Sequence, residues 1–174
     1  CFTCNNTGQL PDECYYPFCG LVAKSFCTCS HGQALWQSWL KSQEVQKAIR
    51  KKRQKDVDKS LKFSQIPKRW REKTLETFED RESLKLKINH YIDNFPESRQ
   101  KGRGLYLWSA GSGCGKTHLL SALCQELIRR YITPAIFMTE EQLYLRIRES
   151  FDSPTIVEKD QYDRFRNIEC LFID

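Results

Sequence analysis

The chain has 174 residues, of which 40% are hydrophobic and 29% are charged, so it is long enough for one modest folded domain and an appendage. No run approaches the roughly 18 apolar residues that cross a bilayer, and no signal-peptide pattern opens the chain, so we expect no membrane partner and a cytoplasmic protein. The sequence starts at Cys1 and its only methionine is Met138, so we expect it to be a piece of a longer protein.

Cysteines crowd the first part of the chain. Of the nine cysteines, six lie within the first 29 residues, and the pairs Cys1-x-x-Cys4 and Cys27-x-Cys29 have the close spacing of metal knuckles. Four thiolates in two such pairs form a closed tetrahedral zinc site, and in a segment without a core the metal itself supplies folding energy. We therefore predict a zinc segment over residues 1–32. The alternatives are a second pair formed by Cys14 and Cys19, and His31 as a ligand.

Residues 33–62 form a basic segment that we expect to be a helical linker. Between Lys41 and Lys62 the sequence has nine bases and three acids, and this difference of six equals the net charge of the whole chain, +6. Such a stretch is either a solvated helix face or a contact to a phosphate backbone. The spacing of Trp36 and Trp39 favours core packing over stacking on bases.

From residue 63 onward the pattern is typical of an α/β domain. A helix with apolar residues on one face runs from Leu84 to Phe95 and ends at Pro96. Beyond it strands, a turn and helices alternate, at Leu105–Trp108, Ser109–Gly115, Thr117–Tyr131, Ala135–Met138, a helix capped by Thr139 with Gln142, and Cys170–Ile173. This order predicts a parallel sheet with helices on both faces, over residues 63–174.

The glycine-rich turn matches a phosphate-binding P-loop. Glycines let backbone N–H groups point at phosphate oxygens, and the helix that follows presents its positive N-terminus to the anion. We predict that Lys116 binds the β- and γ-phosphates, and that Thr117 and Asp174 hold Mg²⁺, with Lys116 and Asp174 as the catalytic residues. The predicted ATP contacts are Ala110, Gly111, Ser112, Gly113, Cys114, Gly115, Lys116, Thr117 and His118.

The three later cysteines carry a weaker signal. Cys114, Cys124 and Cys170 lie in apolar or glycine-rich surroundings, which predicts small apolar fillers. A regulatory thiol at Cys114, inside the predicted phosphate loop, is the alternative.

Several motifs together resemble one family. They are Cys-x-x-Cys-Asn-x-Thr-Gly at the start, the later Cys-x-Cys, the basic helix, Ser64-Gln-Ile-Pro-Lys-Arg-Trp70, Gly104-Leu-Tyr-Leu-Trp108 and Gly113-Cys-Gly-Lys-Thr-His-Leu119. The chain resembles the DnaC/DnaI-type replicative helicase loaders, including phage-borne DnaC-like ATP-binding proteins, over almost its whole length. The P-loop alone is unspecific, whereas the combination with the cysteine knuckle is fairly specific.

This resemblance implies an AAA+ fold, here reaching only to the Walker B strand, with the stretch around Thr77 and Phe78 near the adenine. It implies that the zinc segment contacts a replicative DNA helicase, that the core binds single-stranded DNA and associates with itself, and that ATP acts as a switch for loading the helicase. The second Walker B acid, the sensors and the arginine finger fall beyond residue 174 in the family pattern, so the resemblance assigns none of them.

Three other functions compete with helicase loading. An IstB-type transposase helper ATPase shares the core but usually lacks the cysteine knuckle. A zinc-dependent binding module could carry an inactive ATPase core. A small-molecule kinase also uses a P-loop, but it needs a lid rich in arginine, and the sequence offers no clear one.

Overall fold

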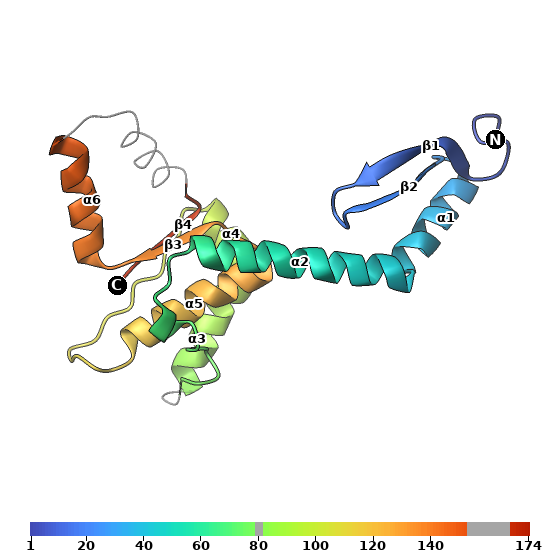
Figure 1. Ribbon diagram of the computed structural model, residues 1–174. Coiled ribbons are helices and arrows are strands. Elements are labelled where there is room, and N and C mark those ends of the chain that lie inside the picture. The colour runs from blue at the N-terminus through green and yellow to red at the C-terminus, as the bar shows by residue number, and fades with distance from the viewer. Residues whose placement is uncertain (79–81, 153–167) are drawn as a thin grey trace. The chain divides into compact units, whose positions relative to one another are not determined.

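The computed structural model describes residues 1–78, 82–152 and 168–174, and the chain divides into two compact units, Cys1–Asp56 and Val57–Asp174 (Figure 1). Over these residues it is a mixed α/β protein with two small sheets and a cluster of cysteines at the N-terminus. The boundary between the units falls within helix α2 (Gln43–Phe63), inside the segment predicted to be a linker. No helix in the described residues is long and apolar enough to cross a membrane.

The first unit is built on a β-hairpin. Strands β1 (Gln9–Tyr16) and β2 (Leu21–Phe26) pair antiparallel, with an irregularity in register between Gln9 and Glu13. Helix α1 (Ser30–Lys41) follows and leads into α2. The sequence predicts a zinc segment here but no strands, because Pro11 and the irregular register interrupt the alternation that reveals a strand.

The helical segment expected over residues 33–62 is divided at Ser42. The Ser42 backbone is extended, and its hydroxyl donates to the Trp39 carbonyl at 2.7 Å and accepts from the Val45 amide at 3.5 Å. One side chain therefore satisfies backbone groups at the end of α1 and at the start of α2. A serine inside a helical pattern is a weak signal, so the sequence did not reveal this break.

An aromatic cluster forms the interior of the first unit. It brings rings of the hairpin against rings of α1, with centroids 4.9 Å apart for Tyr16 and Trp39 and 5.3 Å apart for Phe26 and Trp36. Phe18 lies 5.9 Å from Trp36, edge to face. These separations are those of packed aromatic pairs. The predicted core packing of both tryptophans is confirmed, and it leaves them engaged with protein rather than presented to bases.

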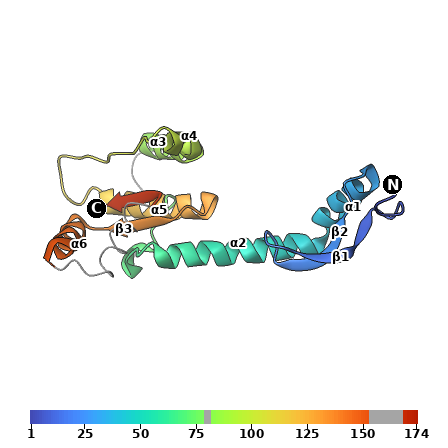
Figure 2. The same cartoon turned by 90° about the horizontal axis from the view of Figure 1, so that it is seen from above.

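The second unit pairs two parallel strands and covers them with helices (Figure 2). Its elements are the end of α2, a 3₁₀ turn at Lys68–Trp70, α3 (Glu82–Asp93), α4 (Phe95–Gln100), α5 (Lys116–Tyr131), β3 (Ala135–Met138), α6 (Glu140–Asp152) and β4 (Cys170–Ile173). In the parallel pair, Phe137 is opposite Phe172. The predicted strands Ala135–Met138 and Cys170–Ile173 are confirmed residue for residue. The capping box is confirmed as well: the Gln142 side-chain oxygen accepts from the Thr139 amide at 3.1 Å, and the Thr139 hydroxyl accepts from the Gln142 amide at 3.3 Å.

The third predicted strand is missing from the described residues. Leu105–Trp108 forms no strand, and Tyr106 and Trp108 are 85% and 74% exposed. In the part of the chain that the structure describes, the parallel sheet therefore has two strands rather than three, and a P-loop fold is not established by it. An apolar run becomes a strand only when another strand pairs with it, and no described strand does so here.

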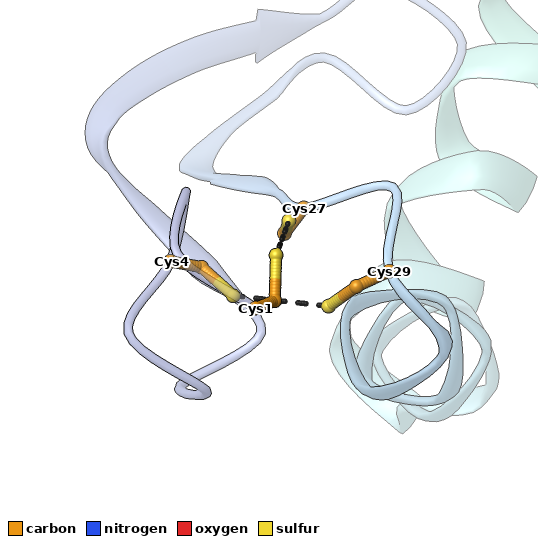
Figure 3. Close-up of side chains that lie close together, drawn as sticks. All are labelled: Cys1, Cys4, Cys27 and Cys29. Carbon is orange, nitrogen blue, oxygen red and sulfur yellow. Dashed lines mark hydrogen bonds between the residues drawn. The ribbon is translucent and has the colours of Figure 1, made fainter.

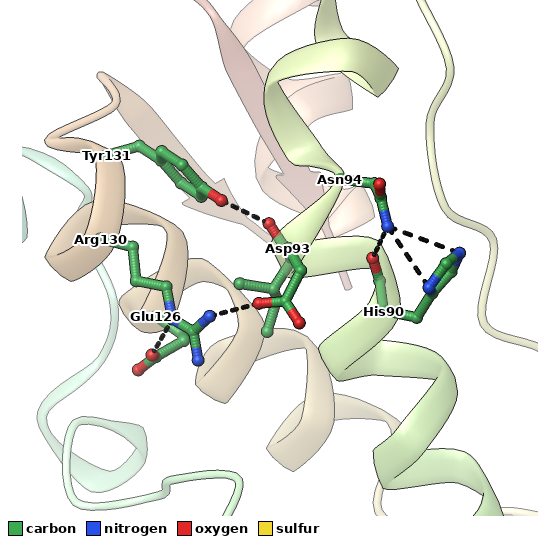
Figure 4. A network of polar contacts seen from close by, with 7 residues as sticks. His90, Asp93, Asn94, Glu126, Arg130 and Tyr131 are labelled. Carbon is green, nitrogen blue, oxygen red and sulfur yellow. Dashed lines mark hydrogen bonds and ion pairs between the residues drawn. The ribbon is translucent and has the colours of Figure 1, made fainter.

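Helices α3 and α5 are joined by buried side chains and by polar contacts. Arg130 bonds Asp93 at 2.6 Å and Glu126 at 2.7 Å, and the Tyr131 hydroxyl donates to the Ile92 carbonyl at 2.7 Å (Figure 4). At the end of α3, the Asn94 amide group donates to the His90 carbonyl at 2.8 Å. Pro96 does not simply end the predicted helix, because it occupies the first turn of α4, where a missing N–H costs nothing.

Replacing Ile92 with alanine should lower the free energy of unfolding of the second unit by about 2–5 kcal/mol, because Ile92 is fully buried and its removal leaves a cavity. Leu86→Ala on the same helix is the control, since Leu86 is 62% exposed and should change stability by less than about 0.5 kcal/mol. Urea denaturation of both variants checks this. Equal losses would mean that Ile92 does not belong to the core.

Candidate metal centre and phosphate-binding loop

Four cysteines converge at the start of the first unit (Figure 3). The sulfurs of Cys1 and Cys27 lie 3.6 Å apart, those of Cys4 and Cys29 lie 3.7 Å apart, and all four fall within 4.8 Å of one another. A tetrahedral zinc ion with bonds of about 2.3 Å separates its sulfurs by roughly 3.8 Å, so these cysteines are close enough to hold a metal ion. The alternative ligands Cys14, Cys19 and His31 lie outside this group.

The first knuckle is shaped by its own backbone. The Thr7 amide donates to the Cys4 carbonyl at 2.8 Å, and Asn5, Asn6 and Gly8 all adopt positive φ angles. Asparagine and glycine tolerate this conformation better than other residues, which explains why these residue types follow Cys4. The Cys27 amide then donates to the Gly8 carbonyl at 2.9 Å. That bond brings the second cysteine pair to the first.

The second knuckle uses the start of α1. Cys29 caps this helix, accepting a bond from the Gly32 amide at 3.4 Å, and that bond is the main reason why the pKa of the Cys29 thiol is lowered. A Cβ at Gly32 would lie 2.0 Å from the Cys27 carbonyl oxygen, so only glycine fits this position. Sequence reasoning missed Gly32, whose role depends on a contact that no local pattern reveals.

The glycine-rich loop in the second unit leads directly into α5. Gly113 and Gly115 have φ angles of 76° and 85°, conformations that favour glycine, and α5 begins at Lys116. The Lys116 ammonium donates to the Ser109 hydroxyl and to the Gly111 carbonyl, each at 3.0 Å. The loop therefore wraps around the ammonium of Lys116, the residue at which α5 begins.

Thr117 and Asp174 meet although 57 residues separate them. The Thr117 hydroxyl donates to the Asp174 carboxylate at 2.8 Å. The Asp174 amide donates to the Met138 carbonyl at 2.9 Å, which extends the pairing of β4 with β3 and holds Asp174 at the end of the strands. A hydroxyl and a carboxylate are the oxygen ligands that Mg²⁺ accepts. The structure thus brings together the two residues predicted to hold this ion.

The segment around Phe78 lies beside the loop. The Phe78 ring is 6% exposed and meets His118 edge to face at 5.4 Å, and a Cβ at Gly115 would lie 2.7 Å from it. A ring nitrogen of His118 is 2.9 Å from the Thr74 carbonyl and 3.3 Å from the Thr77 hydroxyl. His118, a predicted ATP contact, therefore fastens this segment to α5.

The remaining loop residues are open to solvent. Ala110, Gly111, Ser112 and Gly113 are exposed, as the predicted contacts to a ligand require. Cys114 is also exposed, and a hydrogen bond from Ser109, with Lys116 nearby, lowers the pKa of its thiol.

Cys114 therefore does not fill an apolar site, and that prediction is wrong. Cys124 is fully buried, where burial raises the pKa of its thiol, so the prediction is confirmed for this residue. Cys170 is half-buried, and burial raises the pKa of its thiol to about 11.

The chain has no match among the models of known protein families, the curated proteins or the solved structures with which it was compared. The function therefore has to be inferred from the chemistry of the residues at the two sites. The four cysteines that are close enough to hold a metal ion and the glycine-rich loop lie in separate compact units of the chain.

Proposed function

We propose that the chain binds Mg²⁺ and ATP at the loop Ala110–Thr117 and uses ATP as a switch to load a replicative DNA helicase onto single-stranded DNA. The observation that carries the nucleotide site is the 2.8 Å bond between the Thr117 hydroxyl and the Asp174 carboxylate, at the first turn of α5. Two oxygen ligands thus lie at a helix N-terminus, and Lys116 precedes Thr117 in the chain; these are the groups that a triphosphate with Mg²⁺ requires.

The contacts of Lys116 support this proposal. Its ammonium bonds the Ser109 hydroxyl, the Gly111 carbonyl and the Cys114 sulfur, and it forms no ion pair among the described residues. An ionised phosphate group makes a stronger bond to an ammonium than a neutral acceptor does. ATP would therefore displace these contacts. Asp174 would then bind the metal through one of its oxygens, and Lys116 would neutralise charge on the transferred phosphate.

The four cysteines support zinc as the second cofactor. Four thiolates with this spacing fill all the positions of a closed structural site, whereas a catalytic zinc site keeps one coordination position open. The hydrogen bond from the Gly32 amide to the Cys29 sulfur also suits a structural site. Zinc bound there would join the two knuckles and the start of α1. Reduced thiolates of this kind fit a cytoplasmic protein.

The helicase-loading part of the proposal derives from the sequence resemblance. The cysteine site favours a loader over a transposase helper, because the latter usually lacks the knuckle. The same site supports a second candidate, a zinc-dependent binding module with an inactive ATPase core. ATP affinity and ATPase rate, measured with and without single-stranded DNA and the cognate helicase, separate the two. A response to both partners supports the loader, and indifference to both overturns it.

The nucleotide site is tested first through its metal ligand. In Asp174→Asn, Mg²⁺ should no longer strengthen ATP binding, and the affinity for the Mg²⁺ complex should fall by roughly tenfold or more, because a charged ligand is lost. Asp12→Asn makes the same chemical change at an exposed residue of the hairpin and should bind ATP normally. Titration with a fluorescent ATP analogue measures both. An unchanged response to Mg²⁺ in Asp174→Asn contradicts the assignment.

A further inference from the structure

The first unit carries a row of lysines along α2. Lys47, Lys51 and Lys55 follow one another at every fourth position, and all three are exposed. Residues four apart lie on the same helix face, about 6 Å further along the axis. The row therefore presents three positive charges over about 12 Å of one face.

Other residues of the same helix serve packing. Val45 is 1% exposed, Asp56 is half-buried, and the Lys52 ammonium donates to the Pro17 carbonyl at the end of the hairpin. Successive residues are separated by about 100° around a helix, so these three lie on a different side of α2 from the row. The fold thus uses Lys52 internally and leaves the lysine row to solvent.

The lysine row lowers the stability of the helix on which it lies. Like charges four residues apart repel and destabilise a helix. Glu44 is the only acid between Gln43 and Lys55, against six bases. Within the described ranges, no ion pair engages the three lysines of the row. A partner with closely spaced negative charges would relieve this repulsion.

We propose that the lysine row, Lys47, Lys51 and Lys55, binds the phosphate backbone of a nucleic acid. One strand of B-DNA carries a phosphate about every 3.4 Å along the axis, so a 12 Å row spans three to four of them. Trp36 and Trp39 are packed against the hairpin rings, so these two rings are not presented to bases. Binding is therefore independent of base sequence and strongly dependent on salt.

This surface needs neither the phosphate-binding loop nor ATP. The lysine row belongs to the first compact unit and the loop to the second, so each can fail without the other. Loss of ATP binding in a loop variant leaves the row intact, and a row variant keeps its nucleotide affinity. The two proposals are thereby distinguished by separate variants.

The test replaces all three lysines with glutamine, a residue of similar helix propensity. Binding to labelled oligothymidylate and to a duplex of random sequence is measured by anisotropy over a range of salt concentrations. For the single strand, the slope of log K against log salt should become shallower by about 2, because three phosphate contacts each contribute about 0.7. The melting temperature should stay equal or rise slightly, because repulsion within the helix is removed.

A matched control removes three lysines elsewhere. Lys24, Lys73 and Lys87 are exposed, and their replacement by glutamine changes the net charge equally. The control should keep the slope of the unaltered protein. An equal loss in both variants would show a general effect of charge and overturn the proposal. So would an unaltered protein that binds neither oligonucleotide, or one that binds only vesicles of anionic lipid.

Discussion

Replacing Cys1 and Cys4 with serine should release one zinc ion per chain and unfold the hairpin of the first unit. Zinc bound by four thiolates contributes on the order of 10 kcal/mol to folding, which is as much as the stability of a whole small domain. The aromatic cluster around Trp36 and Trp39 rests on this hairpin, so its tertiary signal should disappear with the metal. Zinc analysis and near-ultraviolet circular dichroism measure the two effects.

The matched control replaces Cys14 and Cys19, which are the alternative pair. Both lie in the same unit and Cys19 is buried, yet neither belongs to the group of converging sulfurs. This control should retain stoichiometric zinc. If zinc stays after the loss of Cys1 and Cys4 but leaves after the loss of the inner pair, the ligand assignment is wrong.

Replacing Lys116 with alanine should lower the affinity for ATP by on the order of 100-fold while the fold stays intact. The ammonium would make at least two charge-assisted bonds to phosphates, each contributing about 1.5–3 kcal/mol. In the free protein it bonds Ser109, Gly111 and Cys114, all in the same loop, which is open to solvent, so its loss should cost little stability. Isothermal titration with ATP and a thermal melt check both parts.

Lys87→Ala supplies the comparison, because it removes an exposed lysine from α3 in the same unit. It should bind ATP like the unaltered protein. An ATP affinity that is unchanged in Lys116→Ala would remove the phosphate-binding role of the loop. A lower melting temperature with unchanged affinity would mean that Lys116 is there to hold the loop closed.

Local patterns in the sequence were sufficient to predict those elements whose residues follow a regular pattern over a few positions. The strands at Ala135–Met138 and Cys170–Ile173 were predicted with their observed ends, because short buried apolar runs between polar turns are typical of parallel strands. The capping box at Thr139 was visible because it depends on two residues three positions apart.

The same reasoning failed where a distant partner decides the structure. Leu105–Trp108 has the composition of a strand but lacks a partner strand in the described residues, so Leu105, Tyr106 and Trp108 stay exposed. The hairpin of the first unit was missed for the opposite reason. Its strands have a broken pattern, yet pairing with each other and packing on Trp36 hold them.

By itself, the sequence determined the inventory of chemistry: close cysteine pairs, a glycine-rich loop followed by Lys116 and Thr117, and a basic helix. These three features can be recognised from residue types and from spacings of a few positions, so they need no knowledge of the tertiary structure. Only the tertiary structure decided which groups meet. It selected the four predicted cysteines over Cys14, Cys19 and His31, placed Asp174 against Thr117, and separated Lys52 from the exposed row on α2. Spacing along the chain made these cysteines and Asp174 the leading candidates, but whether such groups meet depends on contacts between residues far apart in the chain.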